Sequence, residues 1–171
     1  MLGPVAHRRS RAPAAAGVAA SLALVALLAC PPAQASTGTV TEFSAGISAG
    51  ANPVGMAAGP DGNLWFAELS GNRVGRITPA GTVTEFSAGI TAGSQPLEIA
   101  AGPDGNLWFT EKSGNRIGRI SPAGTVTEFS TGIALGAQLE GITAGPDGNL
   151  WFTEYLGNRV GRITPSGTVT E

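Results

Sequence analysis

Three glutamates have the residue type and the spacing to do chemistry. Glu68, Glu111 and Glu154 recur 43 residues apart, each in the segment Trp-Phe-x-Glu. Carboxylates that repeat around a common axis could hold a metal or a polar ligand, and oxygen ligands suit Mg²⁺. Each glutamate also lies five residues before an arginine, which favours an ion pair across a hairpin as the simpler account; the arginines are Arg73, Arg116 and Arg159.

A second group of polar side chains lies where the repeated units differ from one another. The units are nearly copies outside three 14-residue windows, residues 45–58, 88–101 and 131–144. Loops on a rigid scaffold are where ligands usually bind, so the windows predict a binding rim. Drift in unconstrained linkers explains the variation equally well. The candidate ligand-binding residues are Asn52, Gln95, Glu98, Gln138 and Glu140.

The elements that would position these residues are repeats of 43 residues. The octet GPDGNLWF occupies residues 59–66, 102–109 and 145–152. The pentapeptide Gly-Thr-Val-Thr-Glu begins at Gly38, Gly81, Gly124 and Gly167. A fixed period of roughly 40 to 50 residues is typical of propellers and solenoids.

Each unit reads as four short strands separated by turns. In the second unit, residues 97–101, 106–111, 116–120 and 125–129 have strand composition, and Gly-Pro-Asp-Gly reverses the chain after the first of them. Four strands per unit predict a propeller blade. The octet is then architectural, with glycine and proline setting the turn and the Leu-Trp-Phe segment filling the space between neighbouring sheets.

The predicted fold class is all-β, with propeller-type repeats of four-stranded blades over residues 36–171. Propellers close with roughly 4 to 8 blades, and this sequence carries three complete units. An incomplete propeller could be a piece of a longer polypeptide, pair with itself into a six-bladed ring, or form an open stack. The spare Gly-Thr-Val-Thr-Glu segments allow a homo-oligomer through strand exchange.

Residues 1–35 are predicted to be a signal peptide and not part of the fold. Three arginines near the start precede an Ala/Leu/Val-rich run, and Ala33-Gln34-Ala35 offers a small-x-small cleavage site after Ala35. The chain is therefore expected to be secreted. Lipid attachment at Cys30 is the alternative, and the paired arginines also suit the twin-arginine route.

Composition narrows the partners of the mature chain. Cleavage after Ala35 removes the only cysteine and the only histidine, His7, and leaves 7 Lys/Arg against 12 Asp/Glu, a net charge of −5. That balance argues against nucleic acid and anionic membrane surfaces as partners. No membrane insertion is expected once the signal is removed, and the ligand is a small molecule or a cell-surface group.

The repeat motifs resemble those of the virginiamycin B lyase (streptogramin lyase) family. The resemblance rests on Gly-Pro-Asp-Gly-Asn-Leu-Trp-Phe-Thr-Glu, Gly-Asn-Arg-Ile-Gly-Arg-Ile and Thr-Val-Thr-Glu-Phe, and covers nearly all of residues 38–171. The resemblance implies the fold and activity of that family, a seven-bladed propeller that opens the lactone ring of type B streptogramin antibiotics by Mg²⁺-dependent elimination. Such an activity would confer antibiotic resistance.

The residues that the resemblance would make catalytic are largely replaced. The positions matching the family's histidine hold Val54, Leu97 and Glu140. The positions matching a family glutamate two residues earlier hold Asn52, Gln95 and Gln138. Only the glutamates after Trp-Phe-x remain as metal candidates, so Mg²⁺ is implied by resemblance alone. We assign no catalytic residue and expect a secreted, non-catalytic binding or scaffold protein, with streptogramin B lyase, completed by further blades, as the alternative.

Overall fold

The computed structural model of the chain describes residues 38–171. The predicted signal peptide, its cleavage after Ala35 and the alternative at Cys30 all lie outside the described residues. A compact unit spans Thr41–Glu171, and its regular secondary structure consists of β-strands. Within residues 38–171, no helix has the length and hydropathy needed to cross a membrane.

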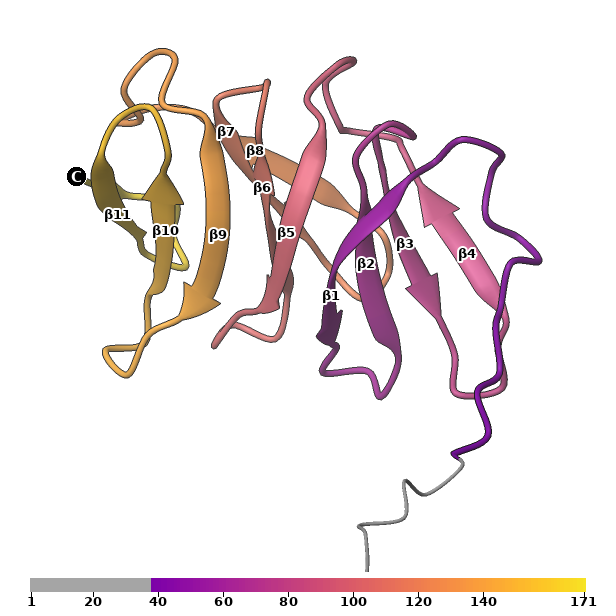
Figure 1. The fold of residues 1–171 in the computed structure, drawn as a ribbon. Coiled ribbons are helices and arrows are strands. Elements are labelled where there is room, and N and C mark those ends of the chain that lie inside the picture. The colour runs from indigo at the N-terminus through magenta and orange to yellow at the C-terminus, as the bar shows by residue number, and fades with distance from the viewer. Residues whose placement is uncertain (1–37) are drawn as a thin grey trace, which may run out of the picture. The chain divides into compact units, whose positions relative to one another are not determined.

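The strands form three four-stranded antiparallel sheets, each made from one repeat (Figure 1). The first sheet holds β1 (Pro53–Ala58), β2 (Leu64–Glu68), β3 (Arg73–Ile77) and β4 (Val83–Phe86). The second holds β5 (Pro96–Ala101), β6 (Leu107–Glu111), β7 (Arg116–Ile120) and β8 (Val126–Phe129). The third holds β9 (Leu139–Ala144), β10 (Leu150–Glu154), β11 (Arg159–Ile163) and β12 (Val169–Thr170). The predicted four-stranded units are confirmed, with strand ends shifted by about a residue.

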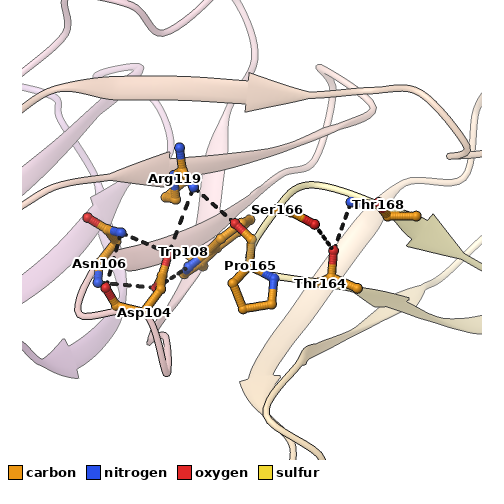
Figure 2. A network of polar contacts seen from close by, with 8 residues as sticks. All are labelled: Asp104, Asn106, Trp108, Arg119, Thr164, Pro165, Ser166 and Thr168. Atoms are coloured by element: carbon orange, nitrogen blue, oxygen red, sulfur yellow. Dashed lines mark hydrogen bonds and ion pairs between the residues drawn. The ribbon is translucent and has the colours of Figure 1, made fainter.

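The Gly-Pro-Asp-Gly segment makes the first turn of each sheet. In the second sheet the N–H of Gly102 donates to the carbonyl of Asn106 at 2.8 Å, and Gly105 has a φ of 74° that favours glycine. The Asp104 carboxylate accepts the indole N–H of Trp108 at 3.0 Å (Figure 2). The octet thus forms the predicted turn, and its aspartate also orients the tryptophan.

Two apolar cores lie between successive sheets. We call the face of a sheet that packs on the next sheet in the chain its trailing face, and the opposite face its leading face. Trp65 and Val74 of the first trailing face are fully buried against Leu107, Phe109 and Ile120 of the second leading face. The second trailing face buries its matching residues in the same way against the third leading face; the cluster includes Trp108, Ile117, Leu150, Phe152 and Ile163.

A cationic side chain ties each pair of neighbouring sheets together. Arg119 lies 5.5 Å from the ring centroid of Trp108 and donates to the carbonyl of Pro165 in the next sheet at 3.0 Å (Figure 2). Arg76 makes the matching contacts with Trp65 and with the carbonyl of Pro122. Because both bonds recur 43 residues apart, the relative position of neighbouring sheets is part of the repeat.

The segment that links two sheets is attached to the sheet that follows it. Glu85 on β4 accepts the backbone N–H of Ser48 at 2.5 Å and its hydroxyl at 2.6 Å. Glu128 holds Thr91 by the same two bonds. Each variable window therefore crosses the end of the following sheet before it enters that sheet's first strand.

The first Gly-Thr-Val-Thr-Glu copy differs from the other three because it forms no strand. It would be the fourth strand of a sheet that precedes β1, and the described residues contain no third strand for it to pair with. Its Phe43 nevertheless packs over Gly81, in space that a Cβ would occupy, as Phe86 packs over Gly124. Phe43 is thus placed like an outer-strand residue that has no sheet of its own within residues 38–171.

Candidate functional site

The three repeated glutamates end the second strand of each sheet and are buried. Glu68 and Glu111 have no exposed surface, and Glu154 is 2% exposed. Their carboxyl oxygens have no hydrogen-bond partner. Burial raises the pKa of Glu68 to about 7, with the nearby Glu85 carboxylate adding to the rise and Arg73 opposing it. Burial likewise raises the pKa of Glu111 to about 8.

In the first sheet, a second glutamate, Glu85 on the fourth strand, lies beside the buried Glu68. Burial opposes ionisation of Glu85, but the hydrogen bonds from Ser48 outweigh it and lower the pKa of Glu85. The first sheet therefore places an acid with a raised pKa, Glu68, next to one with a lowered pKa, Glu85, the arrangement that neighbouring carboxyl groups adopt to avoid repulsion.

The predicted ion pair across the hairpin is present in one of the three sheets. Each repeated glutamate faces its arginine in the strand register, as the spacing predicts. Arg159 reaches Glu154 at 3.9 Å, but Arg73 pairs with Glu85 at 3.5 Å instead. Arg116 likewise pairs with Glu128, at 3.8 Å. In the first sheet the arginine pairs with Glu85, whose pKa is lowered, and not with Glu68, whose pKa is raised by burial.

These glutamates do not make a fitting Mg²⁺ site within residues 38–171. They belong to three different sheets, and no cluster of three or more His, Cys, Asp or Glu side chains is present in the described part of the chain. Mg²⁺ requires near-octahedral oxygen coordination, whereas each buried acid has one further carboxylate and an arginine beside it.

The amides predicted at the rim serve the backbone. Asn52, Gln95 and Gln138 each directly precede the first strand of a sheet and have left-handed φ values of 56°, 58° and 52°. The carbonyl of Gln95 accepts the N–H of Lys112 at 3.0 Å. The turn needs a residue that tolerates this conformation, which suits asparagine better than glutamine.

The two candidate acids lie on the first strands of the second and third sheets. Glu98 on β5 is exposed. Glu140 on β9 lies 3.4 Å from the ammonium of Lys112, and its carbonyl accepts the hydroxyl of Thr110 at 2.6 Å. That hydroxyl also accepts the N–H of Glu98 at 3.1 Å. Thr110 therefore links β5 to β9 across β6.

A pocket of about 320 Å³ opens between the turns of the second and third sheets. Its lining combines an ammonium, a hydroxyl and two amides with one leucine; the residues are Lys112, Ser113, Asn115, Gly136, Gln138 and Leu156. Ser113 also donates to the Gln95 side chain at 2.5 Å. Of the five predicted rim residues, Gln138 lines the pocket and Gln95 borders it. Asn52, Glu98 and Glu140 do not line it.

The pocket residues on the hairpin turns were missed from the sequence, although a signal for them exists. The pair of residues after the buried glutamate differs among the repeats, as Leu69-Ser70, Lys112-Ser113 and Tyr155-Leu156, while the flanking Glu and Gly-Asn-Arg do not change. These short differences lie outside the 14-residue windows. The structure brings them next to the windows because the carbonyl of Gln95 or its equivalent receives the first N–H of each turn.

Sheets of four antiparallel strands that follow one another along the chain and pack face to face are the blades of a β-propeller. The chain is therefore a partial β-propeller of three blades. The family model of the virginiamycin B lyase family matches residues 34–171. The chain belongs to that family.

Solved structures agree with this assignment. Selenomethionine-substituted virginiamycin B lyase from Staphylococcus aureus is 42% identical with a TM-score of 0.74, over 80% of this chain and 45% of that one. A streptogramin B lyase structure is 40% identical with a TM-score of 0.73, over 78% of this chain and 44% of that one. The chain thus spans less than half the length of these relatives. A comparison with curated proteins gives no match.

Proposed function

We propose that this chain is a secreted β-propeller module that binds a small molecule at the turn end of its blades without opening a lactone ring. The observation that carries the proposal is the pocket of about 320 Å³ between the second and third blades, formed where the repeats differ. Its size falls at the lower end of the range of ligand pockets, roughly 300 to 1,000 Å³.

The chemistry of the pocket favours a ligand with hydrogen-bond acceptors and one apolar edge. Lys112 brings an ammonium, and the Asn115 side chain keeps its NH₂ for a ligand because its oxygen accepts the N–H of Ala137 at 3.0 Å. Leu156, which is 61% exposed, supplies an apolar wall. Carbonyl or carboxylate oxygens directed at Lys112 and Asn115 would fit this arrangement.

Binding is tested with quinupristin, the ligand named in one related solved structure. Equilibrium dialysis should show retention that Lys112→Ala weakens by about tenfold, the loss expected for one hydrogen bond to a charged group. Ser113→Ala and its counterpart Ser70→Ala form a matched pair, because only Ser113 lines the pocket. Retention that is insensitive to Lys112→Ala and Ser113→Ala would remove the pocket as the site.

The absence of catalysis is inferred from the residues at the family's histidine positions. Val54 and Leu97 cannot accept a proton, and Glu140 is engaged by Lys112. A Staphylococcus aureus virginiamycin B lyase with a histidine replaced by alanine, 44% identical over 72% of this chain and 42% of that one (TM-score 0.70), is described as catalytically inactive. The described part of this chain contains no histidine.

Streptogramin B lyase activity is the second candidate function, favoured by identities of 40–44% to lyases. The purified chain is incubated with quinupristin and Mg²⁺, and mass spectrometry follows linearised product. We expect no product above a buffer control. Product that disappears in the Glu140→Gln variant would overturn the non-catalytic proposal and assign the base to Glu140.

Export is tested separately, because the proposal that the chain is secreted rests on residues 1–35. The protein from the culture medium should begin at Ser36. A chain that begins at Cys30 and stays with the membrane fraction would support lipid attachment instead.

A further inference from the structure

The two ends of the stack of blades expose large apolar side chains. On the trailing face of the third blade, Trp151 is 36% and Val160 57% exposed. On the leading face of the first blade, Leu64 is 42% and Met56 58% exposed. Hollows of about 310 Å³ and 260 Å³ lie on these two faces, the second one bordered by Phe43.

The two exposed faces repeat the faces that are packed together inside the chain. Trp151 and Val160 correspond to Trp65 and Val74, which have no exposed surface. Leu64 corresponds to Leu107, which the first blade covers completely. The exposed faces therefore continue an interface that the chain already forms twice.

Hydrogen-bonding groups on the two faces are complementary as well. Arg76 and Arg119 each donate to a proline carbonyl of the next blade, at Pro122 and Pro165, both at 3.0 Å. Within residues 38–171, the equivalent Arg162 donates to no proline carbonyl; it lies 3.7 Å from Asp147. The equivalent carbonyl is that of Pro79, on the first blade. One end of the stack thus has the donor and the other end has the acceptor.

The two partners of an aromatic stack also lie at opposite ends, with a tryptophan on the third blade and a phenylalanine beside the first. Trp65 stacks on Phe86 and Trp108 on Phe129, each with ring centroids 5.4 Å apart. In the part of the chain that the structure describes, Trp151 stacks on no phenylalanine and Phe43 on no tryptophan. Phe43 already packs on the first blade as Phe86 packs on the second.

We propose that these faces bind a second copy of this chain, the third blade of each packing on the first blade of the other to form a two-chain ring of six blades. Residues 38–42 of one copy would take the outer-strand place of residues 167–171 in the other. The two segments are identical in sequence. The exchange therefore keeps every strand contact and adds the stack of Phe43 on Trp151.

The proposed contacts run head to tail, from the trailing face of one copy to the leading face of the other. A head-to-tail interface closes when its rotation divides the circle, and six blades lie within the roughly 4 to 8 that propellers use. Two copies then bury both apolar ends, which a single copy leaves in water. This inference goes beyond ligand binding, because it concerns faces that do not line the pocket between the second and third blades.

The mass of the 171-residue chain in solution tests the proposal, since a second copy is then the only source of a further blade. Light scattering coupled to size-exclusion chromatography should give the mass of two chains. Val160→Glu and Met56→Glu should each raise the dissociation constant by at least about tenfold, because an unpaired carboxylate would be buried in each interface. A one-chain mass for the unaltered protein at 100 micromolar or so, well above the dissociation constants of specific pairs, overturns the proposal.

Leu135→Glu is the matched control, placed on a residue that is 98% exposed. The corresponding residues, Ala49 before the first blade and Ala92 before the second, are exposed as well. The position is thus exposed in all three repeats, both at the end of the stack and between two blades, so it lies outside the interface. The control should keep the two-chain mass. Circular dichroism of all three variants verifies that the blades remain folded, which is expected because each altered side chain is exposed.

Mixing the two disruptive variants distinguishes head-to-tail pairing from other arrangements. A ring made of one Val160→Glu chain and one Met56→Glu chain contains one interface with both changes and one with neither. The mixture should therefore recover two-chain particles that neither variant forms alone. If only one of the two variants dissociates the pair, the copies meet through like faces and the head-to-tail arrangement is wrong.

Discussion

Arg119 on the second blade donates a hydrogen bond to the carbonyl of Pro165 on the third blade at 3.0 Å, while its guanidinium lies over the Trp108 ring at 5.5 Å. One side chain therefore joins a cation–π contact to a hydrogen bond between sheets. The fork of donors on a planar arginine allows both at once, which a lysine could not reproduce.

Replacing Arg119 by methionine should lower the free energy of unfolding by about 1–3 kcal/mol, since a cation–π contact and a charged hydrogen bond are both lost. Arg116→Met is the control, because Arg116 makes a partly exposed ion pair with Glu128 at 3.8 Å, and such pairs contribute about 0–1 kcal/mol. Urea denaturation measures both. Equal losses for the two variants would contradict the role given to Arg119.

The buried glutamates predict that the chain loses stability as the pH rises. An unfolded glutamate ionises above about pH 4.3, whereas the folded chain keeps Glu68 protonated to about pH 7 and Glu111 to about pH 8. Between about pH 4.3 and pH 8 the folded state binds more protons than the unfolded state. The stability that these two glutamates contribute is therefore fully present below about pH 4.3 and is lost as the pH rises to about 8.

The measurement is the free energy of unfolding at pH 5 and at pH 8. In the Glu111→Gln variant the free energy of unfolding should fall less between pH 5 and pH 8, because an amide does not ionise. At pH 8 the variant should be more stable than the unaltered chain. Exposed Glu98→Gln serves as the control and should leave the decline unchanged. A decline that Glu111→Gln does not reduce would place its origin elsewhere.

Removing the carboxylate that accepts a buried indole N–H should be costly. Asp104 accepts from Trp108, which has no exposed surface, so Asp104→Ala should reduce the free energy of unfolding by about 1–3 kcal/mol. In Asp147→Ala the partner Trp151 is 36% exposed and can reach water, so the loss should be smaller. Thermal unfolding is measured at a concentration where the chain is a single copy. A loss in Asp147→Ala as large as in Asp104→Ala would contradict this account.

A methyl group at Gly118 should not fit. The Phe109 ring lies against Gly118 in space that a Cβ would occupy, and both residues are buried. Gly118→Ala should therefore destabilise the chain by about 1–3 kcal/mol through overpacking. Gly141→Ala on β9 is the control, because its Cβ would meet only the Thr153 hydroxyl at 3.3 Å. Thermal denaturation of both variants checks the difference, and a Gly118→Ala chain as stable as the control would show that the ring can move aside.

Much of the fold could be predicted from the sequence because its signals are local. The Gly-Pro-Asp-Gly turn, the aromatic strand and the alternating Arg-x-Gly-Arg strand each specify their own backbone over a few residues. The architectural role of the octet, a turn followed by an aromatic strand, was predicted from the same local chemistry. The first Gly-Thr-Val-Thr-Glu copy shows the limit, since a strand needs a neighbour and that copy has none in the described part of the chain.

The candidate site was predicted less well because it depends on packing between sheets. The spacing of Glu68 and Arg73 gave their strand register correctly, but the ionised Glu85 captures the arginine. Which acid keeps its proton depends on burial and on Ser48, 37 residues away from Glu85. The pocket likewise joins turn residues of two blades, and no short window of sequence contains both.

The attachment of each linking segment to the following sheet, through Glu85 and Glu128, has a mechanical consequence. A chain stretched from its two termini should lengthen in jumps, because a linker and the sheet that holds it come free together. Each jump would release one repeat of 43 residues, or roughly 150 Å of extended polypeptide at about 3.5 Å per residue. A force spectrometer would then record a regular sawtooth.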